Sequence, residues 1–247
     1  MNIKQYLDST YLKTPEQAGL SKEDNNEIVK TFVLEAISEN FKLVMIRPDY
    51  VGLAAHLITD AQSSVAVGTV IGFPEGTASI KSKLEEAEIA IEAGADELDF
   101  VCNYTAFKTG NIDLVKEEIL ICTQLALSNL KIAKWIIEVA ALTEHEIVCL
   151  SALIKNVVMS NFAEEHYHSV FVKSSTGFYK TENNLPNGAT NHSIILMLEN
   201  AAPLPIKAAG GIKTFEEAVE MINLGVKRIG TSSAKAIANH EVASNDY

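Results

Sequence analysis

The chain has 247 residues, of which 47% are hydrophobic and 21% are charged. This is the composition of a globular protein, and the length allows one large domain or two small ones. The formal net charge of −12 at pH 7 argues against a nucleic-acid-binding surface, which needs a basic patch. It does not exclude an anionic small molecule, because a few lysines and backbone N–H groups can bind a phosphate locally.

The cysteines and the apolar segments indicate whether the protein binds a metal and where in the cell it is located. Cys102, Cys122 and Cys149 have no metal-ligand spacing, so we expect reduced, mostly buried thiols in a cytoplasmic protein. The N-terminal residues lack the apolar run of a signal peptide. The longest apolar stretch, 118–133, is interrupted by polar residues, so we expect a helix followed by a strand and no membrane span.

Short apolar runs alternate with amphipathic segments along the whole chain. The runs that we predict as strands are Gln5–Ser9, Phe41–Ile46, Ser64–Gly72, Glu97–Cys102, Lys131–Val139, Ser169–Ser174, Leu204–Ala209 and Lys227–Thr231. The first of them is short and polar. The segments between these runs have helical periodicity and helix-end signals.

One predicted helix carries apolar residues at Ile80, Leu84, Ala87 and Ile91, which lie on one helical face, and Gly94 is its predicted C-cap. Two further helices begin with capping boxes, at 143–146 and 214–217, each formed by a threonine and a glutamate three residues later. Gly225 is predicted to end the second of these helices.

No linker divides the chain, so we predict a single domain over residues 1–247. Strict alternation of strands and helices predicts parallel strands joined by crossover helices. Eight such units favour a closed barrel over an open doubly wound sheet, which commonly carries G-x-G-x-x-G after its first strand. The predicted fold class is therefore α/β, as a single (β/α)8 TIM barrel.

The active site of such a barrel lies at the C-terminal ends of its strands. The polar residues near these ends are Asp8, Thr10, Asp99, Lys134, Glu138, Lys173, Lys207 and the segment from Gly230 to Ser233. Lys173 and Lys207 attract most interest because each lies in a strand and is followed by a glycine-bearing loop. A lysine inside a barrel is costly unless it is paired or used.

Two neighbouring ammonium groups would make one of them nucleophilic. At about 5 Å and an effective dielectric constant of about 20, their repulsion is roughly 3 kcal/mol. This lowers a lysine pKa by about 2.4, to near 8, before desolvation is counted. The pair Lys173 and Lys207 is therefore typical of Schiff-base chemistry. Taken alone, either lysine could equally be a strand-end residue that points outward or pairs with Asp99.

Two carboxylates allow two interpretations each. Asp99 interrupts an apolar strand and could hold the ammonium groups or transfer protons, but a purely structural partner of a buried lysine is equally consistent. Lys134 and Glu138 share one face of their predicted strand, so a salt bridge between them is as consistent as a catalytic role.

A phosphate site is predicted from glycines and hydroxyls in the last two loops. Backbone N–H groups and a helix N-terminus there can bind an anion, and loops after strands seven and eight are the usual phosphate seat of these barrels. The candidate residues for phosphate and substrate are Gly177, Gly210, Gly211, Lys213, Gly230, Ser232, Ser233, Asp8 and Thr10. His166 and His168 are interpreted as surface residues.

The sequence resembles the deoxyribose-phosphate aldolase family over nearly its whole length. The stretches that carry the resemblance are Leu7 to Lys13 (LDSTYLK), Gly68 to Pro74 (GTVIGFP), Gly94 to Asp99 (GADELD), Val172 to Phe178 (VKSSTGF) and Lys207 to Gly211 (KAAGG). The two lysine motifs together are the most specific part of it.

The resemblance implies a class I aldolase without metal or cofactor. It would reversibly cleave 2-deoxy-D-ribose 5-phosphate to acetaldehyde and D-glyceraldehyde 3-phosphate in deoxynucleoside catabolism. Lys173 would form the Schiff base, Lys207 would lower its pKa, and Asp99 would relay protons. Tyr247 is similar to a tail tyrosine that folds over the site in some members of the family, although a frayed terminus is also expected.

Three departures from the family bear on substrate preference. Arg47, in the sequence Met45-Ile46-Arg47-Pro48, replaces a small polar residue; Val139-Ala140 replaces Thr-Gly; and 180–186 is an insertion. They leave two alternatives open: a Schiff-base barrel aldolase for a different phosphorylated sugar, and a sugar-phosphate-binding barrel without turnover. An exposed apolar helix face also leaves a homodimer open.

Overall fold

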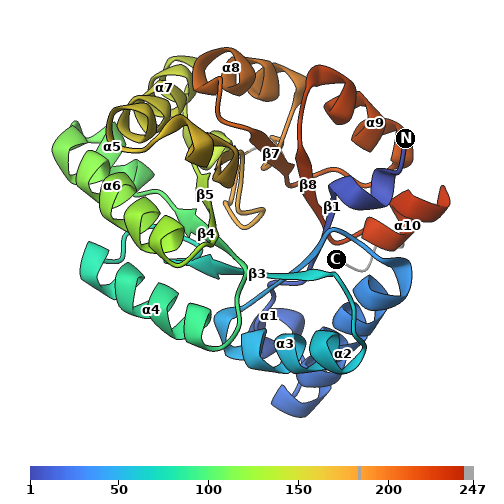
Figure 1. The fold of residues 1–247 in the computed structure, drawn as a ribbon. Helices are drawn as coiled ribbons and strands as arrows, with labels where there is room; N and C mark the ends of the chain where they lie inside the picture. Colours follow the sequence, from blue (N-terminus) through green and yellow to red (C-terminus); the bar gives the residue numbers. More distant parts are fainter. Residues whose placement is uncertain (183–184, 242–247) are drawn as a thin grey trace.

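Eight parallel strands form a closed barrel in the order β1-β2-β3-β4-β5-β6-β7-β8, with β1 paired to β8. The structure is a computed structural model and describes residues 1–182 and 185–241. Figure 1 shows the strands at the centre and the helices around them. The predicted (β/α)8 TIM barrel is confirmed.

The strands are shorter than the apolar runs that predicted them. They are β1 (Leu7–Thr10), β2 (Leu43–Ile46), β3 (Ala66–Ile71), β4 (Glu97–Val101), β5 (Ile132–Ile136), β6 (Val170–Lys173), β7 (Ile206–Ala209) and β8 (Arg228–Thr231).

Most predicted strand boundaries therefore differ from the observed ones, and two of the differences have a clear structural cause. Gln5 belongs to a 3-10 helix, Ile3–Tyr6, and its side chain donates to the carbonyl of Asn40, so pairing begins only at Leu7. The fifth strand ends at Ile136, because Glu138 adopts a left-handed backbone with a φ of 57°, which no strand can include.

The helices lie between the strands in sequence and cover the outside of the barrel. They are α1 (Pro15–Ala18), α2 (Lys22–Glu39), α3 (Val51–Asp60), α4 (Ile80–Glu92), α5 (Tyr104–Lys108), α6 (Ile112–Ser128), α7 (Glu144–Asn161), α8 (Asn191–Ala201), α9 (Phe215–Leu224) and α10 (Ala234–Asn239). None of the helices in the described ranges is long and apolar enough to cross a membrane.

The predicted helix-end signals are largely confirmed. Thr143 and Thr214 each form a complete capping box, and Gly225 ends α9 in a left-handed conformation. One position was wrong: Ala93 is the C-cap of α4, and Gly94, with a φ of 105°, is the next residue. Glycine adopts this conformation without the steric cost that a side chain would bring.

The hydrophobic core has two parts. The larger part fills the space between strands and helices, and burial of each large side chain there contributes roughly 1.5–3 kcal/mol. The smaller part is an apolar cluster of four buried residues from β2, β3 and the loop after β1, namely Leu12, Leu43, Met45 and Val70. A Cβ on Gly68 would lie 2.6 Å from Cε of Met45, so this glycine makes room for the apolar cluster.

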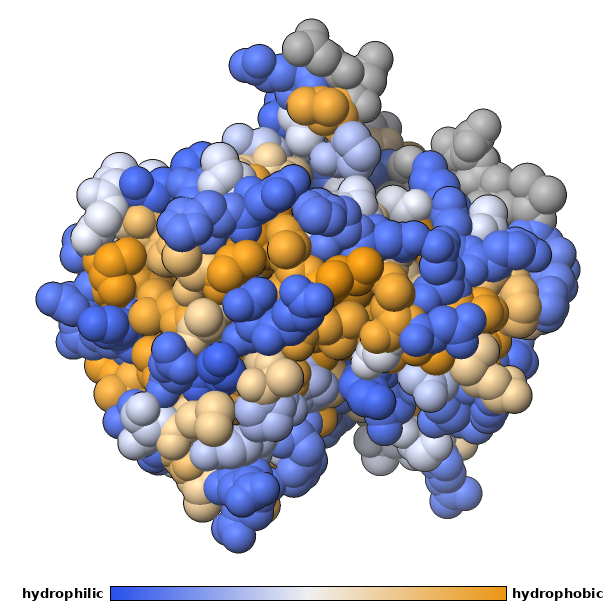
Figure 2. All heavy atoms as spheres, turned by 90° about the horizontal axis from the view of Figure 1, so that it is seen from above, coloured by the Kyte–Doolittle hydropathy of each residue, from blue (hydrophilic) through white to orange (hydrophobic). Residues whose placement is uncertain are grey.

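The surface drawn in Figure 2 has hydrophobic patches that hydrophilic residues interrupt. Among the exposed large hydrophobic residues are Met159 on α7 and Ile195 on α8. Met159 and Ile195 are therefore apolar positions on the outer surface of the barrel.

Candidate active site

A pocket opens at the C-terminal ends of β1, β6, β7 and β8. The predicted site residues that line it are Thr10, Lys173, Gly177, Gly210, Gly211, Lys213, Gly230, Ser232 and Ser233. The other three predicted residues, Asp8, Asp99 and Lys207, are fully buried and do not line it. The structure thus brings the nucleophile candidate to the same pocket as the glycine loops.

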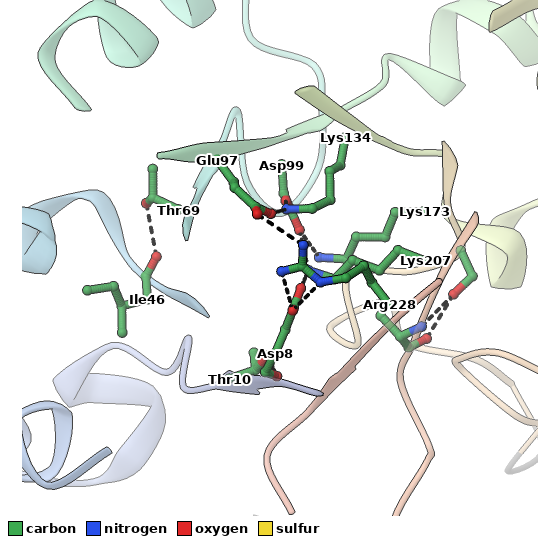
Figure 3. Close-up of polar contacts among 12 residues, drawn as sticks. Asp8, Thr10, Ile46, Thr69, Glu97, Asp99, Lys134, Lys173, Lys207 and Arg228 are labelled. Atoms are coloured by element: carbon green, nitrogen blue, oxygen red, sulfur yellow. Dashed lines mark hydrogen bonds and ion pairs between the residues drawn. The ribbon is translucent and has the colours of Figure 1, made fainter. Parts of the chain in front are cut away.

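Lys173 and Lys207 share one carboxylate. The two residues pair directly across β6 and β7, so both side chains enter the barrel at one level. Lys173 Nζ lies 2.8 Å and Lys207 Nζ 2.9 Å from Oδ2 of Asp99. Figure 3 shows the three side chains converging inside the barrel.

Other charged groups extend this contact into a network below the pocket. Lys134 Nζ lies 2.7 Å from Oδ1 of Asp99 and 2.5 Å from Glu97. Asp8 lies 2.6 Å from Lys207 Nζ. Arg228 on β8 contacts Asp8 at 2.5 Å and Glu97 at 3.0 Å. The predicted alternative of a Lys134–Glu138 salt bridge was wrong, because Asp99 and Glu97 are the carboxylates that Lys134 contacts.

We call these seven side chains the ionic network: Asp8, Glu97, Asp99, Lys134, Lys173, Lys207 and Arg228. It contains three carboxylates and four cations, so one positive charge is in excess when every group is ionised. All of its members are buried, and an uncompensated buried charge is costly. The network therefore favours the loss of one proton.

Lys173 is the member from which that proton is most easily lost. Burial lowers its pKa most, Asp99 opposes the shift, and the repulsion of Lys207 lowers it further, to about 8. Burial alone would raise the pKa of Asp99, but Lys134, Lys173 and Lys207 hold it well below its usual range. The carboxylate stays ionised while Lys173 can be neutral. Repulsion between the two lysines was predicted to lower the pKa of Lys173, but desolvation is the larger cause in the structure.

Glu97 and Arg228 were not predicted as site residues. Glu97 begins β4 and lies two residues before Asp99. Arg228 begins β8 and lies two residues before Gly230. Residues two apart in a strand point to the same side. A spacing of two residues from a predicted site residue could therefore have indicated that Glu97 and Arg228 point into the barrel.

The glycine loops after β6 and β7 have the backbone that a close anion approach requires. Gly177, Gly210 and Gly211 have φ values of 82°, 83° and 82°, which other residues rarely adopt. Thr231 Oγ1 donates to Ile212 at 2.7 Å and accepts from the Ser233 N–H at 3.0 Å. This threonine ties the loop after β7 to the end of β8.

Glu138 holds the loop that follows Lys173. Its Oε2 accepts hydrogen bonds from the backbone N–H of Thr176, at 3.1 Å, and from the Thr176 hydroxyl. Oε1 is buried without a hydrogen bond, and burial raises the pKa of the Glu138 carboxyl above its ordinary value. Thr176 lines the pocket, so Glu138 positions a pocket residue without lining the pocket itself.

Glu138→Ala should lower the free energy of unfolding by about 1–3 kcal/mol, because it leaves the buried N–H and hydroxyl of Thr176 unpaired. Urea denaturation followed by far-UV circular dichroism measures this change. Glu88→Ala, an exposed position on α4, is the matched control and should change the value by less than about 0.5 kcal/mol. Equal effects of the two substitutions would contradict the positioning role.

Several other predicted features have a place in the structure. His166 and His168 lie in a 3-10 helix, Glu164–Ser169, whose residues are not buried. Cys102 and Cys122 are buried, and burial raises the pKa of Cys122 to about 12. Tyr247 and two positions of the predicted insertion, 183 and 184, lie outside the described residues.

Comparison with known proteins gives consistent results. The family described as DeoC/LacD family aldolase matches residues 10–239. Deoxyribose-phosphate aldolases of Streptococcus suis and Thermococcus gammatolerans are each 39% identical to the chain. The first match covers 100% of both chains, and the second covers 96% of this chain and 95% of the relative.

Solved structures agree with the sequence matches. An aldolase called QR15 has a TM-score of 0.79 at 32% identity, covering 97% of this chain and 95% of that chain. The deoxyribose phosphate aldolase of Aeropyrum pernix, described as having a unique tetrameric structure, has a TM-score of 0.76 at 29% identity. It covers 96% of this chain and 89% of that chain.

Proposed function

The chain belongs to the DeoC/LacD family of aldolases, and we propose from this that it is a class I deoxyribose-phosphate aldolase. It reversibly cleaves 2-deoxy-D-ribose 5-phosphate to D-glyceraldehyde 3-phosphate and acetaldehyde, in deoxynucleoside catabolism. The observation that carries the proposal is Lys173, a buried lysine with a pKa lowered to about 8 at a pocket flanked by glycine loops.

In the proposed mechanism, neutral Lys173 attacks the C1 aldehyde carbon of the open-chain sugar and forms a carbinolamine. Loss of water gives a protonated Schiff base. Removal of the proton from the C3 hydroxyl then breaks the C2–C3 bond. The electron pair of this bond moves into the iminium and gives an enamine. D-glyceraldehyde 3-phosphate leaves, C2 is protonated, and water releases acetaldehyde and Lys173.

Asp99 and Lys207 support these proton transfers. Asp99 is 2.8 Å from Lys173 Nζ and 2.9 Å from Lys207 Nζ, so it can pass a proton between the nucleophile and its neighbour. We assign Asp99 as the proton-relay group and Lys207 as the cation that lowers the pKa of Lys173. In this assignment Asp99 returns protons that are released in one step to groups that need them in a later step.

The phosphate of the sugar is assigned to the loops after β6, β7 and β8. The groups that would bind it are Gly177, Gly210, Gly211, Gly230, Ser232, Ser233 and Lys213, all of which line the pocket. Positive backbone φ angles and nearby N–H groups are typical of anion seats. Thr10 is assigned to a substrate hydroxyl, and Asp8, which lies beneath the pocket, acts through Lys207.

Borohydride trapping tests the proposal directly. The protein is incubated with acetaldehyde, reduced and mapped by peptide mass, while cleavage of deoxyribose 5-phosphate is assayed in parallel. An ethyl adduct confined to Lys173, with turnover that persists in EDTA, is the expected result. Absence of both the adduct and the cleavage would refute the assignment and leave a sugar-phosphate-binding barrel.

The pH dependence of kcat/KM should follow the titration of Lys173. Because its pKa in the free enzyme is about 8, only roughly a tenth of the enzyme carries a neutral amine at pH 7. We expect kcat/KM to rise about tenfold between pH 7 and pH 9, with an apparent pKa near 8. A steady-state profile that is flat between these values would contradict the assignment of Lys173 as the nucleophile.

A second candidate is an aldolase of the same mechanism for another phosphorylated sugar. Arg47, which lies beside two phenylalanines near the pocket, and the insertion at 180–186 favour it. Comparison of kcat/KM for deoxyribose 5-phosphate with that for other pentose and hexose phosphates decides between the two. A preference for another phosphorylated sugar would replace the substrate and keep the reaction class.

The remaining assignments concern the whole chain. We propose one domain over residues 1–247, a cytoplasmic location and a homodimer. Exposed Met159 and Ile195 provide apolar surface for self-association, and the relative from Aeropyrum pernix is described as tetrameric. Sedimentation velocity measures the assembly state, and a monomer at micromolar concentration would exclude a stable dimer.

A further inference from the structure

Arg47 is an unusual residue for the mouth of this barrel. It directly follows β2 and precedes the 3-10 helix Pro48–Tyr50. Its side chain is half-buried, and it does not line the pocket. The proposed reaction gives it no role, although a cationic side chain so close to a phosphate-binding pocket is expected to affect the ligand.

Arg47 contacts loops that follow three different strands. Its Nε donates a hydrogen bond of 2.7 Å to the carbonyl of Leu12, after β1. Its guanidinium carbon lies 4.8 Å from the ring centre of Phe73, after β3, and 5.9 Å from that of Phe178, after β6. A cation within about 6 Å of a ring is attracted to it. One side chain therefore joins segments that are far apart in the sequence.

The contacted residues form an apolar wall. Phe73 and Phe178 meet edge to face, with ring centres 5.1 Å apart, and both pack against the apolar cluster. Leu12 and Phe178 also line the pocket that contains Lys173. Arg47 thus lies behind the wall and binds directly to the two residues that present it to the ligand.

Leu12 and Phe178 line the same pocket as Lys173, so in the proposed binding mode they share that pocket with a donor aldehyde bound at Lys173. The acceptor aldehyde carries the phosphate, so it extends from Lys173 toward the glycine loops after β7 and β8. The donor aldehyde is held by its carbonyl carbon at Lys173 Nζ. In this binding mode the phosphate seat is taken by the acceptor, so a further carbon on the donor would extend toward the wall of Leu12 and Phe178.

We propose that Arg47 is a specificity-determining residue, which fixes Leu12 and Phe178 so that the donor space accepts a two-carbon aldehyde and disfavours longer ones. The proposal rests on the proposed function. The guanidinium is required because its Nε donates to Leu12 while its carbon lies within about 6 Å of both aromatic ring centres. A lysine at this position retains the charge and loses that geometry.

The test compares acetaldehyde and propanal as donors, with D-glyceraldehyde 3-phosphate as the acceptor. One methylene in an apolar pocket changes specificity roughly 10–200-fold, so the unmodified enzyme should prefer acetaldehyde by at least about tenfold. Arg47→Met, which keeps the aliphatic stem, should reduce this preference about tenfold, mainly through a lower KM for propanal. Arg47→Lys should behave in the same way, and Lys81→Met, at an exposed position on α4, should leave the preference unchanged.

Two results would overturn the inference. One is an unchanged ratio of the two donors in Arg47→Met and Arg47→Lys. The other is a higher KM for D-glyceraldehyde 3-phosphate with the donor ratio retained, which would make Arg47 a contributor to phosphate binding.

Borohydride trapping of each aldehyde on Lys173 separates this inference from the proposed function. If acetaldehyde is trapped but deoxyribose 5-phosphate is not cleaved, the proposed function fails. The ratio of ethyl to propyl adducts on Lys173 in the unmodified protein and in Arg47→Met then still decides the role of Arg47. An equal ratio in both proteins refutes it.

Discussion

Lys173→Leu should abolish aldol cleavage, with kcat/KM reduced by at least roughly 10⁴-fold. Leucine has no amine to form the Schiff base, and no other lysine lines the pocket at the described residues except Lys213 on its exposed rim. The substitution also removes the excess positive charge of the ionic network, so the protein should fold at least as stably as before. Cleavage of deoxyribose 5-phosphate, measured through the glyceraldehyde 3-phosphate released, gives the rate.

Two further measurements test whether the loss of cleavage in Lys173→Leu is due to loss of the Schiff-base lysine. Borohydride with acetaldehyde should leave Lys173→Leu unlabelled, whereas the exposed-lysine variant Lys81→Leu should retain both label and turnover. Residual activity above about a hundredth of the original would mean that another amine forms the intermediate. In that case the lysine labelled in the variant identifies the nucleophile.

Lys207→Leu should reduce kcat/KM about 10²-fold at pH 7 while retaining the nucleophile. Removing Lys207 leaves three carboxylates facing three cations in the ionic network, so Lys173 no longer gains from losing its proton. Loss of the repulsion, which is of the order of 3 kcal/mol at most, moves the pKa of Lys173 upward by as much as about two. The rising limb of the pH profile should therefore move from about 8 toward 10.

The pH profile separates this electrostatic role from a structural one. If Lys207 only lowers the pKa of Lys173, alkaline pH should restore most of the lost kcat/KM. A loss that is the same at every pH would assign Lys207 to a proton-transfer or packing role. Full turnover at pH 7 would leave it without a part in the reaction.

The barrel was predictable because strand–helix alternation, capping boxes and the absence of a linker all indicate the same topology. The meeting of Lys173, Lys207 and Asp99 inside the barrel was predictable for a related reason. Lys173, Lys207 and Asp99 are charged residues within apolar strands, and parallel strands bring their C-terminal ends together. The end of the fifth strand was not predictable, because the apolar residues on both sides of Glu138 suggest that the strand continues, whereas Glu138 has a left-handed backbone.

The extent of the ionic network could not be derived from single residues. Arg228 belongs to it through contacts with Asp8 and Glu97, which lie 220 and 131 positions away in the sequence. No local pattern specifies such pairings, which depend on closure of the barrel between β1 and β8. The role of Arg47 was open for the same reason, because the loops that it joins follow β1, β3 and β6.

The interior of the barrel is divided between the apolar cluster and the ionic network, and this division has a consequence for how the enzyme can evolve. Buried ion pairs contribute little to folding, and well-packed apolar replacements are often neutral or stabilising by about 1–4 kcal/mol. Selection for heat resistance alone would therefore erode the catalytic half of the barrel. Gains in thermal robustness that preserve activity are expected in the apolar half, where volume-conserving exchanges cost little.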